Sequence, residues 1–355
     1  MNENPPETID NYWLLYHFDV QQLPYAEIME MYGLTKTALA NRLNRLRNKI
    51  AAGEALSLEA HFAAQGVEKP DTDIQVIEEA IRAIQQLQAR YDPVITHYHH
   101  TIKTGKPIAI LLAGCMQIGG RWTYHSMIRE KLEQMLSCPG IYMGQFGDEI
   151  ENFQARSFAG ERSVFDQAIE PRLQRILWDK WLDRVEGLTL WAVGSQHGTI
   201  WDERVKGFAP LKYTYVDRGI PFFDGQSYYK LTVGTEDYNL AIAHEFPGSS
   251  IYNPNHPQGR ALWQRYPNAD VVAMADKHQY SVQERQVYGP EVLAGNRPSP
   301  YVYLIQIGTA KGGPDPYTIR GWERGQTEWP WLVLWPDQHL MKVTRHFDDV
   351  RLWLE

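Results

Sequence analysis

The segment 107–152 limits the possible folds of this chain more than any other stretch. It holds a short apolar run at 108–113, apolar residues at helical spacing over 127–136, and a second short run at 141–146. Short continuous apolar runs are typical of buried strands, and apolar residues three and four apart are typical of a helix with one buried face. Two strands joined by a helix form a βαβ unit, so the segment predicts an α/β fold.

Polar residues follow both predicted strands directly. Cys115 and Gln117 come after the first strand, and Asp148 comes after the second. In α/β sheets, binding and catalytic groups gather outside the carboxyl ends of the strands. The sequence therefore places a candidate site around these three residues.

The composition narrows the possible classes of protein. The chain has 355 residues, 43% of them apolar, which is enough for the core of one large or two modest domains. A formal net charge of −8 means that nucleic acid would need a local basic patch. Two cysteines, Cys115 and Cys138, argue against a disulfide scaffold. Because residues 1–10 are polar and no apolar run is long, we expect a cytoplasmic protein without a membrane partner.

Near the N-terminus, two predicted helices at 25–32 and 36–49 are separated by Gly33, a helix stop, and Thr35, a good N-cap. This order is typical of a helix-turn-helix, which reads DNA with outward side chains of its second helix. The predicted DNA-binding side chains are Lys36, Asn41, Arg42, Arg45 and Lys49. The alternative is a small helical bundle used for dimerisation or docking.

The sequence as a whole predicts three regions: a helical domain at 1–50, a linker with a connecting helix at 51–105, and a large domain at 106–355. Within the large domain the predicted elements are a loop at 156–162, helices at 164–181 and 259–266, sheet edges at 212–215 and 228–233, and strands at 188–193, 239–243, 270–274, 301–307 and 331–335. Strands alternate with helices first and dominate later, which favours an α/β sandwich of two sheets flanked by helices.

Five segments of the large domain resemble, in order, the motifs of the calcineurin-like metallophosphoesterases, especially the phage and bacterial type. That family carries Asp-x-His-x-Gly, Gly-Asp-x-x-Asp/Asn, Gly-Asn-His-Asp/Glu, a lone His and Gly-His-x-His. The counterparts here are 115–119 (CMQIG), 147–152 (GDEIEN), 194–198 (GSQHG), His244 and 275–278 (ADKH). The resemblance runs from Pro107 to the C-terminus and implies a four-layer αββα sandwich of two mixed sheets.

The resemblance also implies two divalent cations bridged by Asp148. The first cation would additionally take Cys115, Gln117 and His278, where the family has Asp, His and His. A thiolate is a poor ligand for manganese or magnesium. Gln117 offers a neutral amide oxygen in place of an imidazole. This half of the site is therefore expected to be weakened.

The second cation would take His244, which matches the family directly, and Asp276, an oxygen ligand in place of a His. The third motif leaves two alignments open. Without a gap, Ser195 replaces the family's Asn and Gln196 replaces the His that protonates the leaving group. With a one-residue insertion, Gln196 supplies the amide and His197 is the general acid.

From these substitutions we expect an eroded dinuclear site that is catalytically weak or inactive. It would hold one or two divalent cations (manganese, zinc or magnesium) or none. The protein would associate with DNA through its N-terminal helices, or with a phosphate-containing ligand. The alternative is an active metal-dependent phosphodiesterase or nuclease with an unusual ligand set. Homo-oligomerisation is open under either hypothesis.

Overall fold

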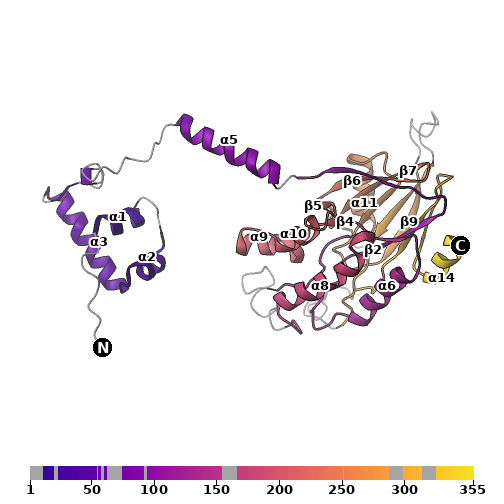
Figure 1. Cartoon of the computed structure of the whole chain (residues 1–355), viewed down its shortest axis with the longest axis horizontal. Helices are drawn as coiled ribbons and strands as arrows, with labels where there is room; N and C mark the ends of the chain where they lie inside the picture. Colours follow the sequence, from indigo (N-terminus) through magenta and orange to yellow (C-terminus); the bar gives the residue numbers. More distant parts are fainter. Residues whose placement is uncertain are drawn as a thin grey trace. The chain divides into compact units, whose positions relative to one another are not determined.

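A computed structural model describes residues 11–19, 23–53, 55–56, 60–61, 74–91, 94–153, 166–250, 252–287, 299–313 and 325–355. The chain divides into two compact units, Met1–Asp92 and Pro93–Glu355, and each is described by itself (Figure 1). None of the described helices combines the length and the hydropathy of a membrane span.

The first unit is helical, as expected. Its helices are α1 (Asn11–Asp19), α2 (Tyr25–Tyr32), α3 (Lys36–Ala51) and α5 (Ile74–Tyr91). Gly33 ends α2 with a φ of 62°, and the Thr35 hydroxyl begins α3 by accepting a hydrogen bond from the amide of Ala38 at 3.2 Å. The side chains buried between α1, α2 and α3 are Leu14, Leu15, Ile28, Leu39, Leu43 and Leu46.

One sheet of the second unit has six strands in the order β12-β11-β2-β3-β4-β5. They are β2 (Ile108–Ala113), β3 (Ile141–Gln145), β4 (Thr189–Val193), β5 (Phe222–Phe223), β11 (Trp331–Leu334) and β12 (Met341–Thr344). Strands β2 to β5 are parallel, whereas β11 is antiparallel to both of its neighbours. The predicted βαβ unit, β2 to β3 through α6 (His125–Ser137), therefore lies at the centre of a mixed sheet.

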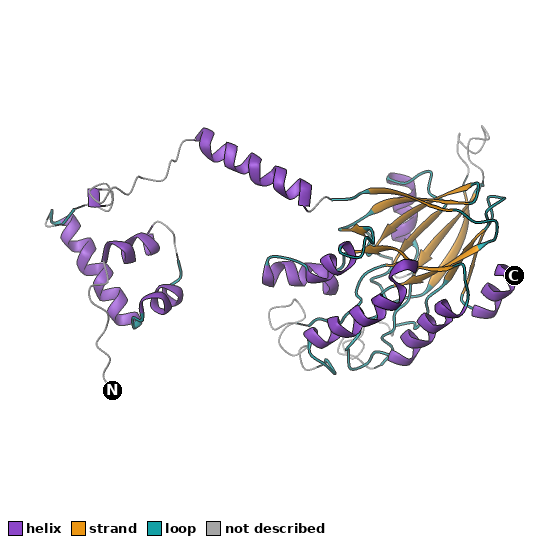
Figure 2. Ribbon diagram, viewed as in Figure 1, coloured by secondary structure: helices purple, strands orange, loops and turns teal. Residues whose placement is uncertain are grey.

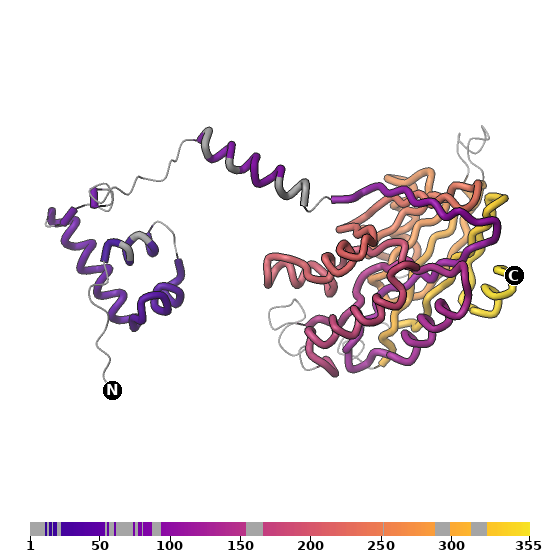
Figure 3. The backbone as a smooth tube through the Cα atoms, in the orientation of Figure 1, coloured from indigo at the N-terminus to yellow at the C-terminus, as the bar shows by residue number. Residues whose placement is uncertain are grey.

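The other sheet also has six strands, in the order β1-β6-β7-β8-β10-β9. They are β1 (His97–Ile102), β6 (Ser227–Val233), β7 (Glu236–Ala243), β8 (Val271–Met274), β9 (Ser281–Gln286) and β10 (Tyr301–Gln306). Figure 3 shows the early strand β1 beside the much later β6, to which it is parallel. Strands β7, β8 and β10 also run parallel, while β6 and β9 are antiparallel to their neighbours β7 and β10.

Alternating side chains show that the second sheet is covered on both faces. Leu240 and Ile242 of β7 belong to a large core shared with the first sheet. Ala241 and Ala243 instead pack with Leu262 of α11 (His256–Gln264) on the opposite face. Since side chains alternate along a strand, Leu240 and Ile242 face the first sheet, and the large core extends between the two sheets.

Helices α6, α8 (Pro171–Val185) and α14 (Phe347–Leu354) add Ile128, Trp178 and Val350 to this core. The remaining short helices are η1 (Glu186–Leu188), η2 (Gln196–Ile200), α9 (Trp201–Lys206) and α10 (Pro210–Val216). Two mixed sheets with helices outside them form an α/β sandwich, which confirms the predicted fold class (Figure 2).

Three predicted elements need correction. The segment 228–233 was expected at a sheet edge but lies in β6, between β1 and β7. The segment 212–215 was expected to be a sheet edge but lies in α10, where Pro210 occupies the first turn and Leu211 and Tyr215, four residues apart, are buried. The helix expected at 164–181 begins at Pro171 and continues to Val185, because proline is favoured in the first turn of a helix. The loop expected at 156–162 lies outside the described residues.

Candidate functional site

The predicted metal ligands all follow the ends of four strands drawn from both sheets. Cys115 and Gln117 follow β2, and Asp148 follows β3, in one sheet. His244 follows β7, and Asp276 and His278 follow β8, in the other sheet. Backbone hydrogen bonds join neighbouring loops, from the amide of residue 115 to the carbonyl of 147 and from the amide of 275 to the carbonyl of 244. The site therefore lies where the carboxyl ends of strands from both sheets meet.

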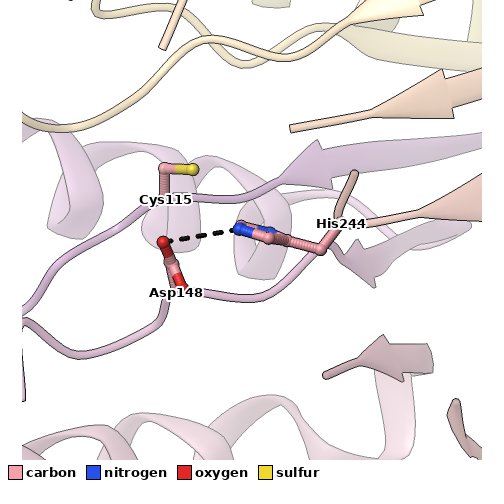
Figure 4. Close-up of side chains that lie close together, drawn as sticks. All are labelled: Cys115, Asp148 and His244. Atoms are coloured by element: carbon pink, nitrogen blue, oxygen red, sulfur yellow. Dashed lines mark ion pairs between the residues drawn. The ribbon is translucent and has the colours of Figure 1, made fainter. Parts of the chain in front are cut away.

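Three of these residues form a compact cluster. Within the described part of the chain, Cys115, Asp148 and His244 have candidate ligand atoms that all lie within 4.8 Å of one another (Figure 4). The His244 Nε2 atom is 3.4 Å from Asp148 Oδ2 and 3.7 Å from Asp276 Oδ1. Three side chains are therefore close enough to share one cation, and Asp276 lies beside them next to His244.

The hydrogen bonds of His244 determine which of its nitrogens faces this space. Its Nδ1 lies 2.6 Å from the carbonyl oxygen of Phe146. A carbonyl can only accept, so Nδ1 carries the hydrogen. Nε2 is buried, makes no hydrogen bond, and faces the carboxylates of Asp148 and Asp276. Metal-binding histidines are typically held in this way, with the second ring nitrogen donating to a carbonyl or carboxylate.

The electrostatics of the cluster favour a cation. Burial alone would lower the pKa of His244, but the charge of Asp148, assisted by Asp276, raises it to about 9. Burial also opposes ionisation of Asp148, but His244 and His197 hold its pKa far below the ordinary range. Burial raises the pKa of the Cys115 thiol, and both carboxylates raise it further. Without a bound cation, the pocket therefore holds a carboxylate that attracts a proton onto His244 and keeps the thiol neutral.

The backbone is strained at most of the same positions. Among the described residues, six non-glycine residues have positive φ: Cys115 (47°), Gln117 (48°), Asp148 (56°), Asn152 (46°), Asp276 (62°) and His278 (55°). A left-handed backbone costs such residues on the order of 1–3 kcal/mol each and is found where function requires it. Five of the six are residues that the sequence proposed as ligands.

The second half of the site is arranged differently. The Gln117 amide nitrogen lies 3.2 Å from Nε2 of His278, so the amide donates to the imidazole. The Gln117 Oε1 atom is buried without a hydrogen-bond partner. Burial, followed by the positive charge of Lys311, lowers the pKa of His278 to about 4. The imidazole is therefore neutral, and its Nε2 is already engaged by Gln117.

Two charged residues in this half were not assigned a role from the sequence. Lys311 Nζ lies 2.6 Å from Glu151 Oε1, and the two side chains are 4% and 0% exposed. Glu151 stands inside the segment 147–152 that carries the resemblance, which was a usable signal. Lys311 follows β10 in a stretch that matches none of the five motifs, so no sequence signal pointed to it.

The third motif supports Asp148. The Ser195 hydroxyl accepts hydrogen bonds from the amides of Asp148 at 2.7 Å and Gly198 at 3.1 Å. The amide of His197 donates to Asp148 Oδ1 at 3.0 Å, and its Nδ1 lies 2.5 Å from the carbonyl of Glu151. Gln196 turns away, with its Nε2 3.4 Å from Glu245. Ser195 and His197 thus hold Asp148, and Gln196 lies outside the cluster.

The predicted DNA-binding residues lie on one helix of the first unit. On α3, Lys36, Asn41, Arg45 and Lys49 are exposed, and Arg42 is half-buried. The neighbouring Arg47 is paired with Asp19 and lies over the Phe18 ring at 5.2 Å. Asn44 and Asn48, which the sequence reading left out, are also exposed on α3.

Comparisons with known proteins add little to this geometry. No family model and no curated protein matches the sequence. A conserved uncharacterised protein from Streptococcus pneumoniae TIGR4, titled a predicted phosphoesterase, is 10% identical over 68% of this chain and 98% of its own, with a TM-score of 0.30. A protein of unknown function from Aquifex aeolicus is 12% identical over 47% of this chain and 78% of its own, with a TM-score of 0.22. Both TM-scores are low, so the fold class rests on the two sheets and their helices.

Proposed function

We propose that the second unit binds a single divalent cation and, through it, phosphate-containing ligands, with weak or no hydrolysis. The observation that carries this proposal is the Nε2 atom of His244. It is buried, makes no hydrogen bond, and faces the carboxylates of Asp148 and Asp276. Without a cation, a proton on this nitrogen pairs with Asp148, and a divalent cation would replace that proton between the same atoms.

The donor set fits such a cation. His244, Asp148 and Asp276 would hold it through one nitrogen and carboxylate oxygens, a combination that suits manganese or zinc. Cys115 would join as a thiolate only with a soft metal such as zinc. A bound divalent cation would supply Lewis-acid attraction for a phosphoryl oxygen. The residues of the chain orient it, since Ser195 and His197 fix Asp148.

Weak hydrolysis follows from the second half of the site. Two-metal hydrolysis needs a second cation to activate water and to stabilise the leaving oxygen. Gln117 and His278 instead hydrogen-bond to each other. The alternative, an active phosphodiesterase or nuclease, is favoured by one observation: Cys115, Gln117 and His278 keep a strained backbone.

Metal titration tests the proposal. Isothermal titration with manganese and zinc, with elemental analysis of the dialysed protein, should give one cation per chain. Asp148→Asn should weaken binding by at least about 100-fold. His99→Ala is the matched control, because His99 lies on β1 and hydrogen-bonds to Thr232. Absence of bound metal in the wild type would refute the proposal. Bis-p-nitrophenyl phosphate turnover that Asp148→Asn abolishes would favour the active enzyme.

We also propose that the first unit binds DNA through α3. The supporting observation is the division of its surface: Leu39, Leu43 and Leu46 are buried, while the basic and amide side chains described above are exposed. Such side chains can contact phosphates and base edges.

The DNA proposal is tested with the whole chain and a fluorescent duplex. Anisotropy should show weaker binding and a smaller salt dependence for the double variant Arg42→Ala, Arg45→Ala. Arg82→Ala on α5 is the control, because this exposed arginine lies outside the helix pair. An unchanged affinity of the double variant would instead favour helices that only dimerise.

A further inference from the structure

The ion pair of Lys311 and Glu151 lies inside the ligand loops. Residue 311 forms a β-bridge with Thr123, and the amide of Ala310 donates to the carbonyl of Cys115 at 3.0 Å. The hydroxyl of Thr309 donates to the same carbonyl at 2.9 Å. The segment that carries Lys311 is therefore fastened to the loop that carries two of the candidate ligands.

Two glycines show that the ion pair borders the half of the site that holds Gln117 and His278. A Cβ atom on Gly120 would lie 2.7 Å from Glu151 Oε2 and 3.1 Å from the carbonyl oxygen of Gln117. A Cβ atom on Gly325 would lie 2.5 Å from the carbonyl oxygen of Lys311 and 3.6 Å from Cβ of His278. Gly120 thus lies between the Glu151 carboxylate and the backbone of Gln117, and Gly325 lies between the backbone of Lys311 and the side chain of His278.

We propose that Lys311 is a fixed cation beside the second metal position and that it limits the site to one divalent cation. This inference rests on the proposed function, because it concerns the same site. Two effects of the ammonium group act together. It neutralises Glu151, the buried carboxylate that would otherwise be available there to a dication. It also places a positive charge in a buried region, where repulsion of a second cation is poorly screened.

A further observation agrees with this role. A buried ion pair is a poor source of net stability, since well-packed apolar residues often serve equally well. A role in setting the charge of the site explains why a lysine and a glutamate stand there.

The test restores the ligands typical of the family and then removes the lysine. The restored protein carries Cys115→Asp and Gln117→His. A second protein adds Lys311→Met and Glu151→Gln, which removes both charges and leaves no unpaired carboxylate. The control adds only Lys311→Arg to the restored protein, which keeps the positive charge. Manganese per chain is measured by equilibrium dialysis, and electron paramagnetic resonance reports whether two manganese ions are coupled.

We expect one manganese per chain in the restored protein and in the Lys311→Arg control. We expect two, with the spectrum of a coupled pair, once both charges are removed. Two manganese ions in the restored protein that retains Lys311 would overturn the inference. Failure to gain an ion after charge removal, in protein with an unchanged circular dichroism spectrum, would overturn it as well.

A second variant guards against misfolding. If the charge-neutral protein does not fold, Lys311→Gln in the restored background, with Glu151 kept, should gain the second ion, and failure to do so would count against the inference. Failure of the proposed function looks different, because the wild-type protein would then bind no manganese. The role of Lys311 is tested by a different comparison, namely whether the restored protein binds one more manganese ion after the charge of Lys311 is removed.

Discussion

The candidate site has two halves, one around His244 and one around Gln117 and His278. Their backbone conformations are alike, but the contacts of their side chains differ. Around His244, the Nε2 atom makes no hydrogen bond and faces Asp148 and Asp276, which accept from the His197 amide and from Lys277. Around Gln117, its amide donates to His278 and Lys311 is paired with Glu151, while Gln117 Oε1 and Glu151 Oε2 have no partner among the described residues. Both halves keep the left-handed backbone at ligand positions. The difference indicates that cation binding depends here on the state of the side chains more than on the path of the chain.

The largest expected effect lies in the half of the site that holds the ion pair of Lys311 and Glu151. Lys311→Ala leaves the Glu151 carboxylate buried without its cation, and breaking a buried pair in this way costs about 3–5 kcal/mol. The double variant Lys311→Met, Glu151→Gln should recover most of this loss. Urea unfolding at neutral pH measures both. Equal losses in the two variants would show that the ion pair itself is what stabilises this half.

In the half around His244, we expect a substitution to change the affinity for metal more than the stability of the fold. Asp148→Asn removes the carboxylate that faces Nε2 of His244 and should weaken manganese binding by at least about 100-fold, or about 2.7 kcal/mol. Calorimetric titration measures the change. Chelator treatment of the wild type should lower its melting temperature but leave that of Asp148→Asn in place. If Asp148→Asn and the wild type bound manganese with comparable affinity, the half around His244 would not be the cation site.

A smaller effect is expected at Cys115, where a substitution should change the affinity for zinc but not for manganese. Cys115→Ser should weaken zinc binding by about tenfold and leave manganese binding nearly unchanged, because thiolates prefer soft metals. Competition titrations with both ions measure the ratio. A loss of manganese affinity equal to that of zinc would indicate that the residue acts by packing rather than as a ligand.

The smallest effect is expected at Gln117. Gln117→Met keeps the volume and removes the hydrogen bond to His278, which should change stability by about 1 kcal/mol. Manganese affinity should stay within about threefold, since cation binding is assigned to the other half. Thermal unfolding and calorimetry report the two quantities separately. A large fall in affinity would place Gln117 in the cation site.

The sequence predicted the candidate site from two signals, the ends of the buried strands and the order of the motifs. The runs at 108–113 and 141–146 located β2 and β3, and the ends of these strands located Cys115 and Asp148. The resemblance placed Gln117 and His278 at one cation, but their direct hydrogen bond was not predicted, because it depends on the side-chain geometry of loops that are 161 residues apart in the chain.

Other features left no trace in the residue pattern. Lys311 stands in no motif, and its role depends on the folded proximity of Glu151. The left-handed backbone was also hidden, because a positive φ is usually signalled by glycine and these positions carry none. The helix α10 was mistaken for a strand because a short run of Tyr and Thr favours either structure until packing decides.

The strained backbone at Cys115 and Gln117 has a consequence for laboratory evolution. Asparagine and glycine adopt this conformation at lower cost, so either replacement would relieve strain. A selection that rewards heat resistance alone would favour such replacements. Variants obtained in that way would melt later while losing the side chains that face the site. Screens of this protein should therefore pair each gain in melting temperature with a metal-binding assay.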